Sequence, residues 1–491
     1  MTKVVIIGAG LAGSLLAIYL GKRGIAVDVY ESRGDMRLAG VEAGRSINLA
    51  LSNRGIAALR AVGMDEYMLA EAVPMYGRMI HSVAGETKLL PYSGRKGEYI
   101  NSVSRAGLNV ALINEAEKYP GVRLFFNEKC VDFDCESGEV TFVSGRTTRG
   151  DTLIATDGAG SAVRHAMERQ MPEFCMSSVF LEHGYKELHI PAAKNPVAIA
   201  LGSDIELNAL HIWPRHKFMM IALPNFDGSF TCTLFLAHTG GDLSGSEGVV
   251  NESNSQVKNS LHTGRVSASA AEPSFDQLTD EDSLLEFFNR EFPDAVPLMS
   301  TLTEDFFHNP TGNLGTVKCW PWNVGGKALL LGDSAHAMVP FYGQGMNCAF
   351  EDVRVLDSLL EKHGTKSEPG AIETGLVSGI DWESVYQEYG RLRKINTDAI
   401  QDMAVENFYE MRDAVADPIF MRKRELETKL EHTYSDYFSK YSMVTFRDDL
   451  PYSVAKEKGN AQDRLLMEIC SKIESVDKID LEITVNQLNS L

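Results

Sequence analysis

The chain begins with a pattern of buried strand, glycine turn and helix. An apolar run of β-branched residues at 4–7 predicts a parallel strand that is covered on both faces. Apolar residues continue as a helix after the turn, and a second strand at 25–30 ends at Glu31, where a carboxylate can hold a ribose hydroxyl. The turn contains three spaced glycines, Gly8, Gly10 and Gly13. This order predicts a dinucleotide site, because such glycines let a pyrophosphate approach the backbone beside a helix N-terminus.

The same stretch permits another interpretation, because residues 4–21 carry no charge and could form a signal peptide or a membrane span. Four glycines interrupt it, only Lys3 precedes it, and no small-residue cleavage site follows directly. We therefore interpret it as a dinucleotide-binding turn, although glycines alone do not distinguish NAD from FAD. Arg45, in a glycine-flanked turn further on, could be surface charge or could lie near the cofactor.

Two later stretches repeat the strand, turn and helix. A buried strand at 153–156 ends in Asp157-Gly158, and another at 328–331 ends in Gly332-Asp333. The helix that follows each turn points its free N–H groups at a cofactor. The residues also permit a plainer interpretation, in which Asp333 caps a helix. For His336 they favour a packed core histidine over a functional one.

The segments between these turns alternate strands with helices. Residues 56–70 predict an amphipathic helix, and residues 122–145 predict a β-meander. Strands at 75–83 and 85–93 predict a hairpin that carries Arg78 and Tyr92. On a strand both side chains could face water, and the residues alone favour that interpretation. Arg105 stands where a strand leads into a helix, a place where a cation can meet a phosphate.

The fold class follows from this order of elements. Residues 176–236 have the spacing of an antiparallel sheet, residues 238–273 have the composition of a flexible surface insertion, and the chain is helical and charged after residue 381. We predict an α/β protein with a Rossmann-like nucleotide-binding domain, an inserted antiparallel-sheet substrate domain and a C-terminal helical region. The predicted domains are 1–74, 100–175 and 304–363 for the nucleotide, 75–99 and 176–303 for the substrate, and 381–491 for the helices.

Composition narrows the class of partner and the chemistry. The chain has 491 residues and a net charge of −20, which argues against nucleic acid and anionic membranes as main partners. Its seven cysteines form no CxxC pair and no cluster with histidine. We therefore expect a reducing compartment, no disulfide framework and no metal site. Past residue 21 no apolar run is long enough to span a bilayer.

Three spaced motifs carry a resemblance to a known family. GAGLAG at 8–13, TDG at 156–158 and GDSAHAMVPFYGQGMN at 332–347 together resemble the single-component FAD-dependent aromatic hydroxylases. The resemblance implies that the nucleotide-binding domain is an FAD-binding domain and that NADPH is the second cofactor. The cofactor-binding positions it implies are Gly8, Gly10, Ala12, Gly13, Glu31, Arg33, Arg105, Cys130, Asp157, Asp333, Gly345, Met346 and Asn347.

Further stretches, among them GRSINLALS, RMIHS, YINSVSR and NFYEMR, resemble the members of that family that hydroxylate L-kynurenine. This implies a reaction of L-kynurenine, O2 and NADPH, through a flavin C4a-hydroperoxide, to 3-hydroxykynurenine, a step of tryptophan degradation and NAD biosynthesis. The substrate-binding residues it implies are Arg78, Tyr92, Asn407 and Tyr441. We also expect Phe341 to bind the substrate, as part of an apolar pocket beside the flavin. Gln344 is the implied catalytic residue, placed between flavin and substrate.

The chain departs from that family in three ways. The loops at 238–273 and 364–380 look longer than usual, and Phe408 stands where a Tyr is common. The hydrophobic tail that anchors eukaryotic members to the outer mitochondrial membrane is missing, so we expect a cytoplasmic protein unless a longer natural form carries an anchor. Monomer and homodimer both remain open. A related hydroxylase acting on another aromatic acid, and a flavin-bearing redox interaction protein, are the alternative functions.

Overall fold

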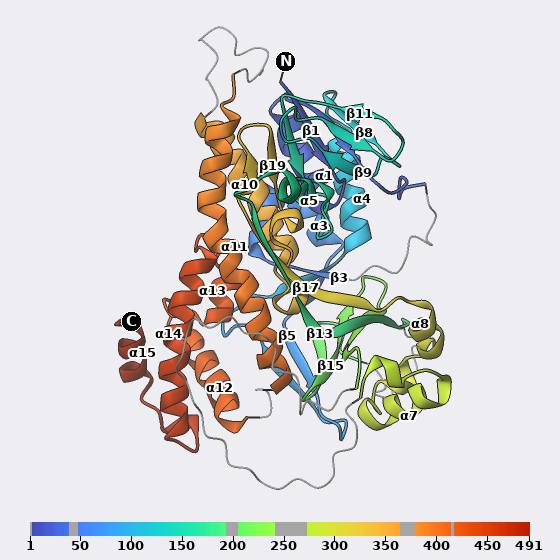
Figure 1. The fold of residues 1–491 in the computed structure, drawn as a ribbon. Helices are drawn as coiled ribbons and strands as arrows, with labels where there is room; N and C mark the ends of the chain where they lie inside the picture. Colours follow the sequence, from blue (N-terminus) through green and yellow to red (C-terminus); the bar gives the residue numbers. More distant parts are fainter. Residues whose placement is uncertain (1, 39–47, 193–204, 241–272, 364–378, 414–416) are drawn as a thin grey trace.

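The structure is a computed structural model that describes residues 2–38, 48–192, 205–240, 273–363, 379–413 and 417–491 (Figure 1). Arg45 and most of the stretches expected as long loops, at 238–273 and 364–380, lie outside the described residues. Among the residues that are described, no helix combines the length and the apolar character that crossing a bilayer requires.

A six-stranded sheet forms the core of the first half of the chain. Its strands, in spatial order, are β18 (Asn323–Val324), β19 (Ala328–Leu330), β12 (Thr152–Ala155), β1 (Lys3–Ile7), β2 (Ala26–Tyr30) and β8 (Val122–Phe125). All neighbours run parallel except β18, which pairs antiparallel with β19 at one edge. The helices α1 (Leu11–Lys22), α4 (Arg105–Ala116) and α10 (Gly345–His363) pack beside it. The central strands are buried because both faces are covered.

Two small sheets complete this half. One contains β3 (Asn48–Leu51), β7 (Ile100–Ser104) and β4 (Val73–Met75), and the other β11 (Thr147–Thr148), β10 (Val140–Phe142) and β9 (Cys130–Phe133). The predicted meander is therefore shorter than expected, because β8 joins the parallel sheet instead. The predicted helix at 56–70 is divided into α2 (Asn53–Arg60) and α3 (Asp65–Ala70). Gly63, at φ +75°, breaks it, since that backbone conformation ends a helix.

A seven-stranded sheet lies below the first one in the view of Figure 1. Its strands, in spatial order, are β17 (Gly312–Trp320), β13 (Cys175–Ile190), β16 (Phe230–Ala237), β15 (Phe218–Pro224), β14 (Ala209–Arg215), β5 (Gly77–His81) and β6 (Thr87–Pro91). The predicted hairpin is confirmed as β5 and β6. We expected β17 in the nucleotide-binding domain, yet it pairs with β13 here. The long β13 makes this possible, because its first half pairs with β17 and its second half with β16.

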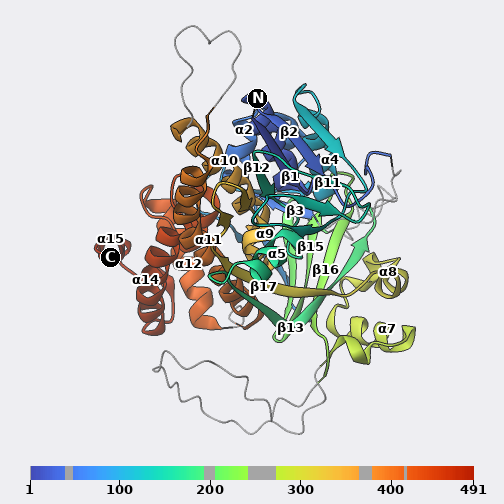
Figure 2. The ribbon, with the colours of Figure 1, turned by 45° about the horizontal axis from the view of Figure 1, so that its top comes forward.

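Helices cover both faces of the seven-stranded sheet (Figure 2). On one side α7 (Glu281–Glu291) and α8 (Leu302–His308) bury the apolar side chains of β15 and β16. On the other side lie α11 (Trp382–Asp413), α12 (Pro418–Thr433), α13 (Lys440–Phe446), α14 (Tyr452–Ser471) and α15 (Leu481–Asn489). The predicted fold class is confirmed.

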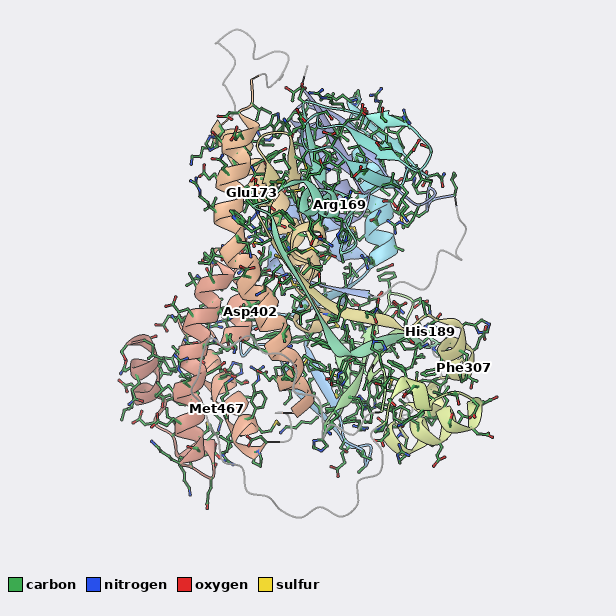
Figure 3. All side chains as sticks on the ribbon, in the orientation of Figure 1. Arg169, Glu173, His189, Phe307, Asp402 and Met467 are labelled. Carbon is green, nitrogen blue, oxygen red and sulfur yellow. The ribbon has the colours of Figure 1, made fainter. Side chains whose placement is uncertain are left out.

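The long helix α11 joins the two halves (Figure 1). Its first turns pack Tyr386 and Tyr389 into the core of the parallel sheet, and Met403 and Phe408 belong to the core beside the antiparallel sheet. Asp402, labelled on α11 in Figure 3, pairs with Lys318 of β17 at 2.5 Å and Lys456 of α14 at 2.8 Å.

Candidate active site

The three predicted turns meet at one edge of the parallel sheet. A Cβ on Gly8, whose φ is +103°, would lie 2.5 Å from the carbonyl oxygen of Thr156, in the second motif. A Cβ on Gly332, in the third motif, would lie 3.6 Å from the Cβ of Ala12. The carboxyl ends of parallel strands bring these turns together, at the place where open α/β sheets bind ligands.

The first turn combines close packing with an open space. A Cβ on Gly13 would lie 2.0 Å from the carbonyl oxygen of Gly8, so helix and strand are too close for any side chain there. A Cβ on Gly10 would meet no atom within 4 Å. Gly10 is also the N-cap of α1, and no side chain caps the helix there. The turn therefore presents free N–H groups to a space that fits a diphosphate.

Glu31 lies at the end of β2, beside this space. One carboxylate oxygen accepts the N–H of Ala9 at 2.8 Å, and the other accepts Arg33 Nε at 2.8 Å. Burial raises the pKa of Glu31, but hydrogen bonds from the Arg33 side chain and backbone outweigh it, so the pKa is lowered overall. The residue is therefore an ionised acceptor, as a ribose hydroxyl requires. The Arg33 side chain is 64% exposed.

Ser334 links the second and third turns. Its hydroxyl donates to Asp157 Oδ1 at 3.0 Å and accepts the N–H of Gly158 at 3.1 Å. Asp157 Oδ2 accepts the N–H of Ala162, the first residue of α5 (Ala162–Gln170), at 2.8 Å. The Asp157 side chain thus shapes the turns. Asp333 differs, because its carboxylate is exposed, caps no helix and has no hydrogen bond within the described part of the chain. The helix-cap interpretation of Asp333 was wrong.

The remaining predicted cofactor residues lie around the same edge. Arg105 is exposed at the start of α4. Cys130 is buried, and its burial, followed by the charge of Asp157, raises the pKa of its thiol to about 12. Gly345 and Met346 are the first two residues of α10. These positions, together with the open first turn, fit FAD.

Asn347 fixes the loop between the third turn and α10. Its Oδ1 accepts the N–H of Ser52 at 2.9 Å, and its Nδ2 donates to the carbonyl oxygens of Ala50 and Gly343 at 2.8 and 2.9 Å. The side chain is fully buried. Its side-chain amide is therefore occupied by hydrogen bonds within the protein, so Asn347 could contact FAD only through its backbone.

His336 is a packed core histidine, which is the interpretation that the sequence favoured. Its Nε2 lies 2.6 Å from Asp352 Oδ2, and the ring is buried beside Trp322. His336, Cys348 and Asp352 lie close enough to hold a metal ion. Asp352 also pairs with Arg393 at 2.6 Å, however, and a neighbouring guanidinium opposes cation binding. Burial raises the pKa of Asp352, but the charges of His336 and Arg393 outweigh it and lower the pKa overall.

Two adjoining cavities lie between the antiparallel sheet and the C-terminal helices. The first is lined by Tyr342, Met403, Glu406, Asn407, Glu410, Lys423, Arg424, Glu427, Lys440 and Tyr441. The second is lined by Arg78, Ile80, Leu90, Ile212, Glu410, Met411, Phe420 and Arg424. They share Glu410 and Arg424, which our sequence analysis missed. Glu410 lies one helical turn from Asn407, the one sequence signal that could have indicated it.

Arg78 faces the second cavity from β5. Its buried Nε has no hydrogen-bond partner among the described residues, and none of their carboxylates pairs with it. The guanidinium carbon lies 4.6 Å from the centre of the Tyr441 ring and 5.7 Å from that of Tyr92. Burial lowers the pKa of Arg78, but the hydroxyls of Tyr441 and Tyr92 raise it more. Arg78 is therefore a partly buried cation that forms no ion pair with a carboxylate of the described residues, although Glu410 lines the same cavity.

The aromatic side chains beside Arg78 form a stack. Tyr92 and Tyr441 are stacked with ring centres 5.5 Å apart, and Tyr342 also stacks with Tyr441 at 5.5 Å. Tyr92 is only 3% exposed, and Arg78 is half-buried. The water-facing interpretation of these two residues was wrong. Burial raises the pKa of Tyr92 above its usual value, so its hydroxyl remains a neutral donor.

Asn407 and Phe341 connect this pocket to the loop before α10. Asn407 Nδ2 donates to the carbonyl oxygen of Phe341 at 2.6 Å and contacts Met411 Sδ at 3.3 Å. Both N–H groups of the amide are thus engaged in this conformation. The Phe341 ring packs between Phe235 and Phe408, at 4.9 and 4.5 Å between ring centres. Gln344 is buried in the same loop, and its Oε1 accepts the Tyr452 hydroxyl at 2.9 Å.

Comparisons with known proteins agree with this geometry. A family model described as an FAD binding domain matches residues 1–196 and 307–373. The kynurenine 3-monooxygenase of Myxococcus xanthus is 41% identical over 493 residues, covering 99% of this chain and 95% of the relative. That of Stenotrophomonas maltophilia is 42% identical over 482 residues, covering 97% and 94%. The chain therefore has an FAD-binding domain, and the matched residues include all three turns.

Solved structures support the fold alone, because their sequence identity is low. A variant of 2-methyl-3-hydroxypyridine-5-carboxylic acid oxygenase has a TM-score of 0.62 at 19% identity, covering 87% of this chain and 98% of its own. A p-nitrophenol 4-monooxygenase from Pseudomonas putida has a TM-score of 0.59 at 18% identity, covering 95% and 99%.

Proposed function

This chain belongs to the kynurenine 3-monooxygenase family, and we propose that it hydroxylates L-kynurenine to 3-hydroxykynurenine with bound FAD, NADPH and O2. The environment of the Arg78 side chain is the main observation that supports this choice of substrate. A guanidinium whose Nε is buried, which has no carboxylate partner among the described residues and is framed by two tyrosine rings, suits an anion with a flat face. A substrate carboxylate would satisfy it with two parallel hydrogen bonds.

The residues of the pocket bind and orient the substrate. Arg78 holds the carboxylate, and Tyr92 and Tyr441 are neutral hydroxyl donors beside it. Asn407 could add a donor only by releasing Phe341 or Met411, so in this conformation it tethers the loop before α10. Glu410 supplies a negative charge at the same cavity, which suits the ammonium group of an amino acid.

The reaction requires little acid–base catalysis by the protein. Bound FAD, reduced by NADPH, supplies the activated oxygen. The aniline amine of L-kynurenine already activates the ring carbon beside it, so positioning and exclusion of water are the protein's main contributions. The apolar packing of Phe341, Phe235 and Phe408 excludes water on the side of the loop. The Gly10 space and the exposed Asp333 would hold the phosphate and ribityl portions of the cofactor.

Substitution of Arg78 tests this proposal. Arg78→Ala leaves a desolvated carboxylate unpaired, a loss of about 2–5 kcal/mol, or roughly 30-fold to several thousand-fold in kcat/KM for L-kynurenine. Arg78→Lys keeps the positive charge but lacks the paired N–H donors of a guanidinium, so its kcat/KM should lie between those of the wild type and Arg78→Ala. Steady-state kinetics measures both, and FAD content should remain that of the wild type.

Lys88→Ala is the matched control, because Lys88 is an exposed basic residue on β6 of the same hairpin. It should change kcat/KM by less than about threefold. Equal, small effects of Arg78→Ala and Lys88→Ala would contradict carboxylate binding by Arg78.

A further inference from the structure

Tyr452 is the hydrogen-bond partner of Gln344. It is the first residue of α14 and is fully buried, and its hydroxyl donates to Gln344 Oε1 at 2.9 Å. Within the described residues the Gln344 carboxamide makes no other hydrogen bond. The contact spans 108 residues of sequence and joins the C-terminal helices to the loop before α10.

Arg54 fixes the position of the Tyr452 ring. Its guanidinium carbon lies 3.9 Å from the ring centre, and its Nη1 pairs with Glu351 of α10 at 2.6 Å. Arg54 also donates to the backbone carbonyls of Val444 and Leu450, in the segment that leads into α14. The arginine is fully buried, so these contacts are desolvated and directional. The Tyr452 hydroxyl is therefore held relative to α2 and α10, the helices beside the cofactor turns.

The hydrogen bond sets the orientation of the Gln344 amide. A hydroxyl has one proton to donate, and no other acceptor for that of Tyr452 occurs among the residues described. Burial raises the pKa of Tyr452 well above its usual value, so this proton stays in place. If the amide were flipped, the hydroxyl would lose its acceptor. The amide oxygen therefore faces Tyr452, and both amide N–H groups face away from it.

We propose that Tyr452 is a positioning residue, which holds the Gln344 carboxamide so that its N–H groups face the flavin and the substrate. The loop supports this placement, because Asn347 Nδ2 holds the carbonyl of Gly343 and Asn407 Nδ2 holds that of Phe341. Gln344 thus lies between residues of the cofactor side and of the substrate cavity. The role of Tyr452 toward the substrate rests on the proposed function.

Tyr452→Phe tests the proposal, because it removes the hydroxyl and keeps the ring on Arg54. The loss of one hydrogen bond corresponds to a change of about 2-fold to 12-fold in an equilibrium or rate ratio. We therefore expect the amount of hydroxylated product per NADPH consumed to decrease by about 2-fold to 12-fold, while KM for L-kynurenine stays within about twofold of the wild type. The visible absorption bands of bound FAD should also shift. A residue that only packs would lower the melting temperature and leave the spectrum and the product ratio at wild-type values, which would overturn the proposal.

Tyr437→Phe is the control, because the Tyr437 hydroxyl is buried without a hydrogen-bond partner and lies among the C-terminal helices. It should keep the wild-type spectrum and product ratio. Gln344→Ala, alone and combined with Tyr452→Phe, provides the second test. If Tyr452 acts through Gln344, the double variant matches Gln344→Ala in both readouts. Additive effects would overturn the proposal. If the wild type does not hydroxylate L-kynurenine, the proposed function fails, and the FAD spectra still decide the role of Tyr452.

Discussion

Gly10 and Gly13 belong to one turn but are required for different physical reasons. A methyl group on Gly13 would collide with backbone at 2.0 Å, whereas one on Gly10 would enter open space. We expect Gly13→Ala to lower the stability of the apoprotein. Gly10→Ala should leave that stability within about 0.5 kcal/mol but weaken FAD binding by about tenfold or more, because the methyl group enters the diphosphate space. Thermal melts and FAD titration of both apoproteins measure these effects.

The contrast between the two variants is itself the control. If Gly10→Ala bound FAD as tightly as the wild type, the diphosphate would not lie against this turn. If Gly13→Ala folded with wild-type stability, the close approach of α1 to β1 would not be the reason for that glycine.

At this scale, residue types were easier to predict than orientations. The local pattern indicated Glu31 and Asp333 at strand ends, and both lie at the cofactor edge. The same pattern favoured a water-facing Arg78, because a strand alone does not show what covers it. Its cover, Tyr441, lies 363 positions further along the chain. The Gln344 amide was expected between flavin and substrate, but its hydrogen bond to Tyr452 depends on a tertiary contact that no local spacing encodes.

A buried histidine pair joins the strands β5 and β14. His81 Nδ1 lies 2.7 Å from Asp294, His81 Nε2 lies 2.8 Å from His211 Nδ1, and His211 Nε2 donates to the carbonyl oxygen of Glu206. Burial lowers the pKa of His211 from 6.5 to about 4. The unfolded chain therefore binds a proton that the folded chain rejects between these pH values, and stability falls as the pH falls from 6.5 toward 4.

We expect this pair to make the antiparallel sheet acid-sensitive. At pH 5 the lowered pKa of His211 removes about 2 kcal/mol of unfolding free energy relative to pH 7. His211→Gln should flatten the dependence by about that amount, whereas His308→Gln, at an exposed histidine of α8, should keep the wild-type slope. Denaturant unfolding at pH 7 and pH 5 gives these differences. Identical slopes for the wild type and His211→Gln would contradict a neutral buried His211.

Helices and strands were predictable where the local sequence pattern determines them. Their positions were less predictable where they depend on which strands pair. The hairpin of β5 and β6 and the strand β1 follow from alternation and from an apolar run. The placement of β8 and β17 does not follow from local pattern, because the pairing of a strand depends on contacts with segments that are distant in the sequence. β8 joins the parallel sheet beside β2, and β17 crosses to pair with β13. The division between α2 and α3 has a local cause in Gly63, whose positive φ ends the first helix.

The whole molecule brings the candidate site together from segments that are distant in sequence. β5 carries Arg78, α11 carries Asn407 and Glu410, and α13 carries Tyr441. Helix α11 spans both cores, and Asp402 ties it to β17 and α14 (Figure 3). The class of fold and the cofactor were predictable because three local motifs carry them. The cavities were not, since they exist only where these layers meet.

We propose that this chain uses FAD to hydroxylate L-kynurenine. Purified protein should be yellow with one FAD per chain, and NADPH oxidation measured with and without L-kynurenine tests the claim most directly. We predict that L-kynurenine accelerates NADPH oxidation and that 3-hydroxykynurenine accumulates. Acceleration by another aromatic acid but not by L-kynurenine would contradict the substrate assignment. NADPH oxidation that no aromatic substrate accelerates would contradict the hydroxylase account altogether.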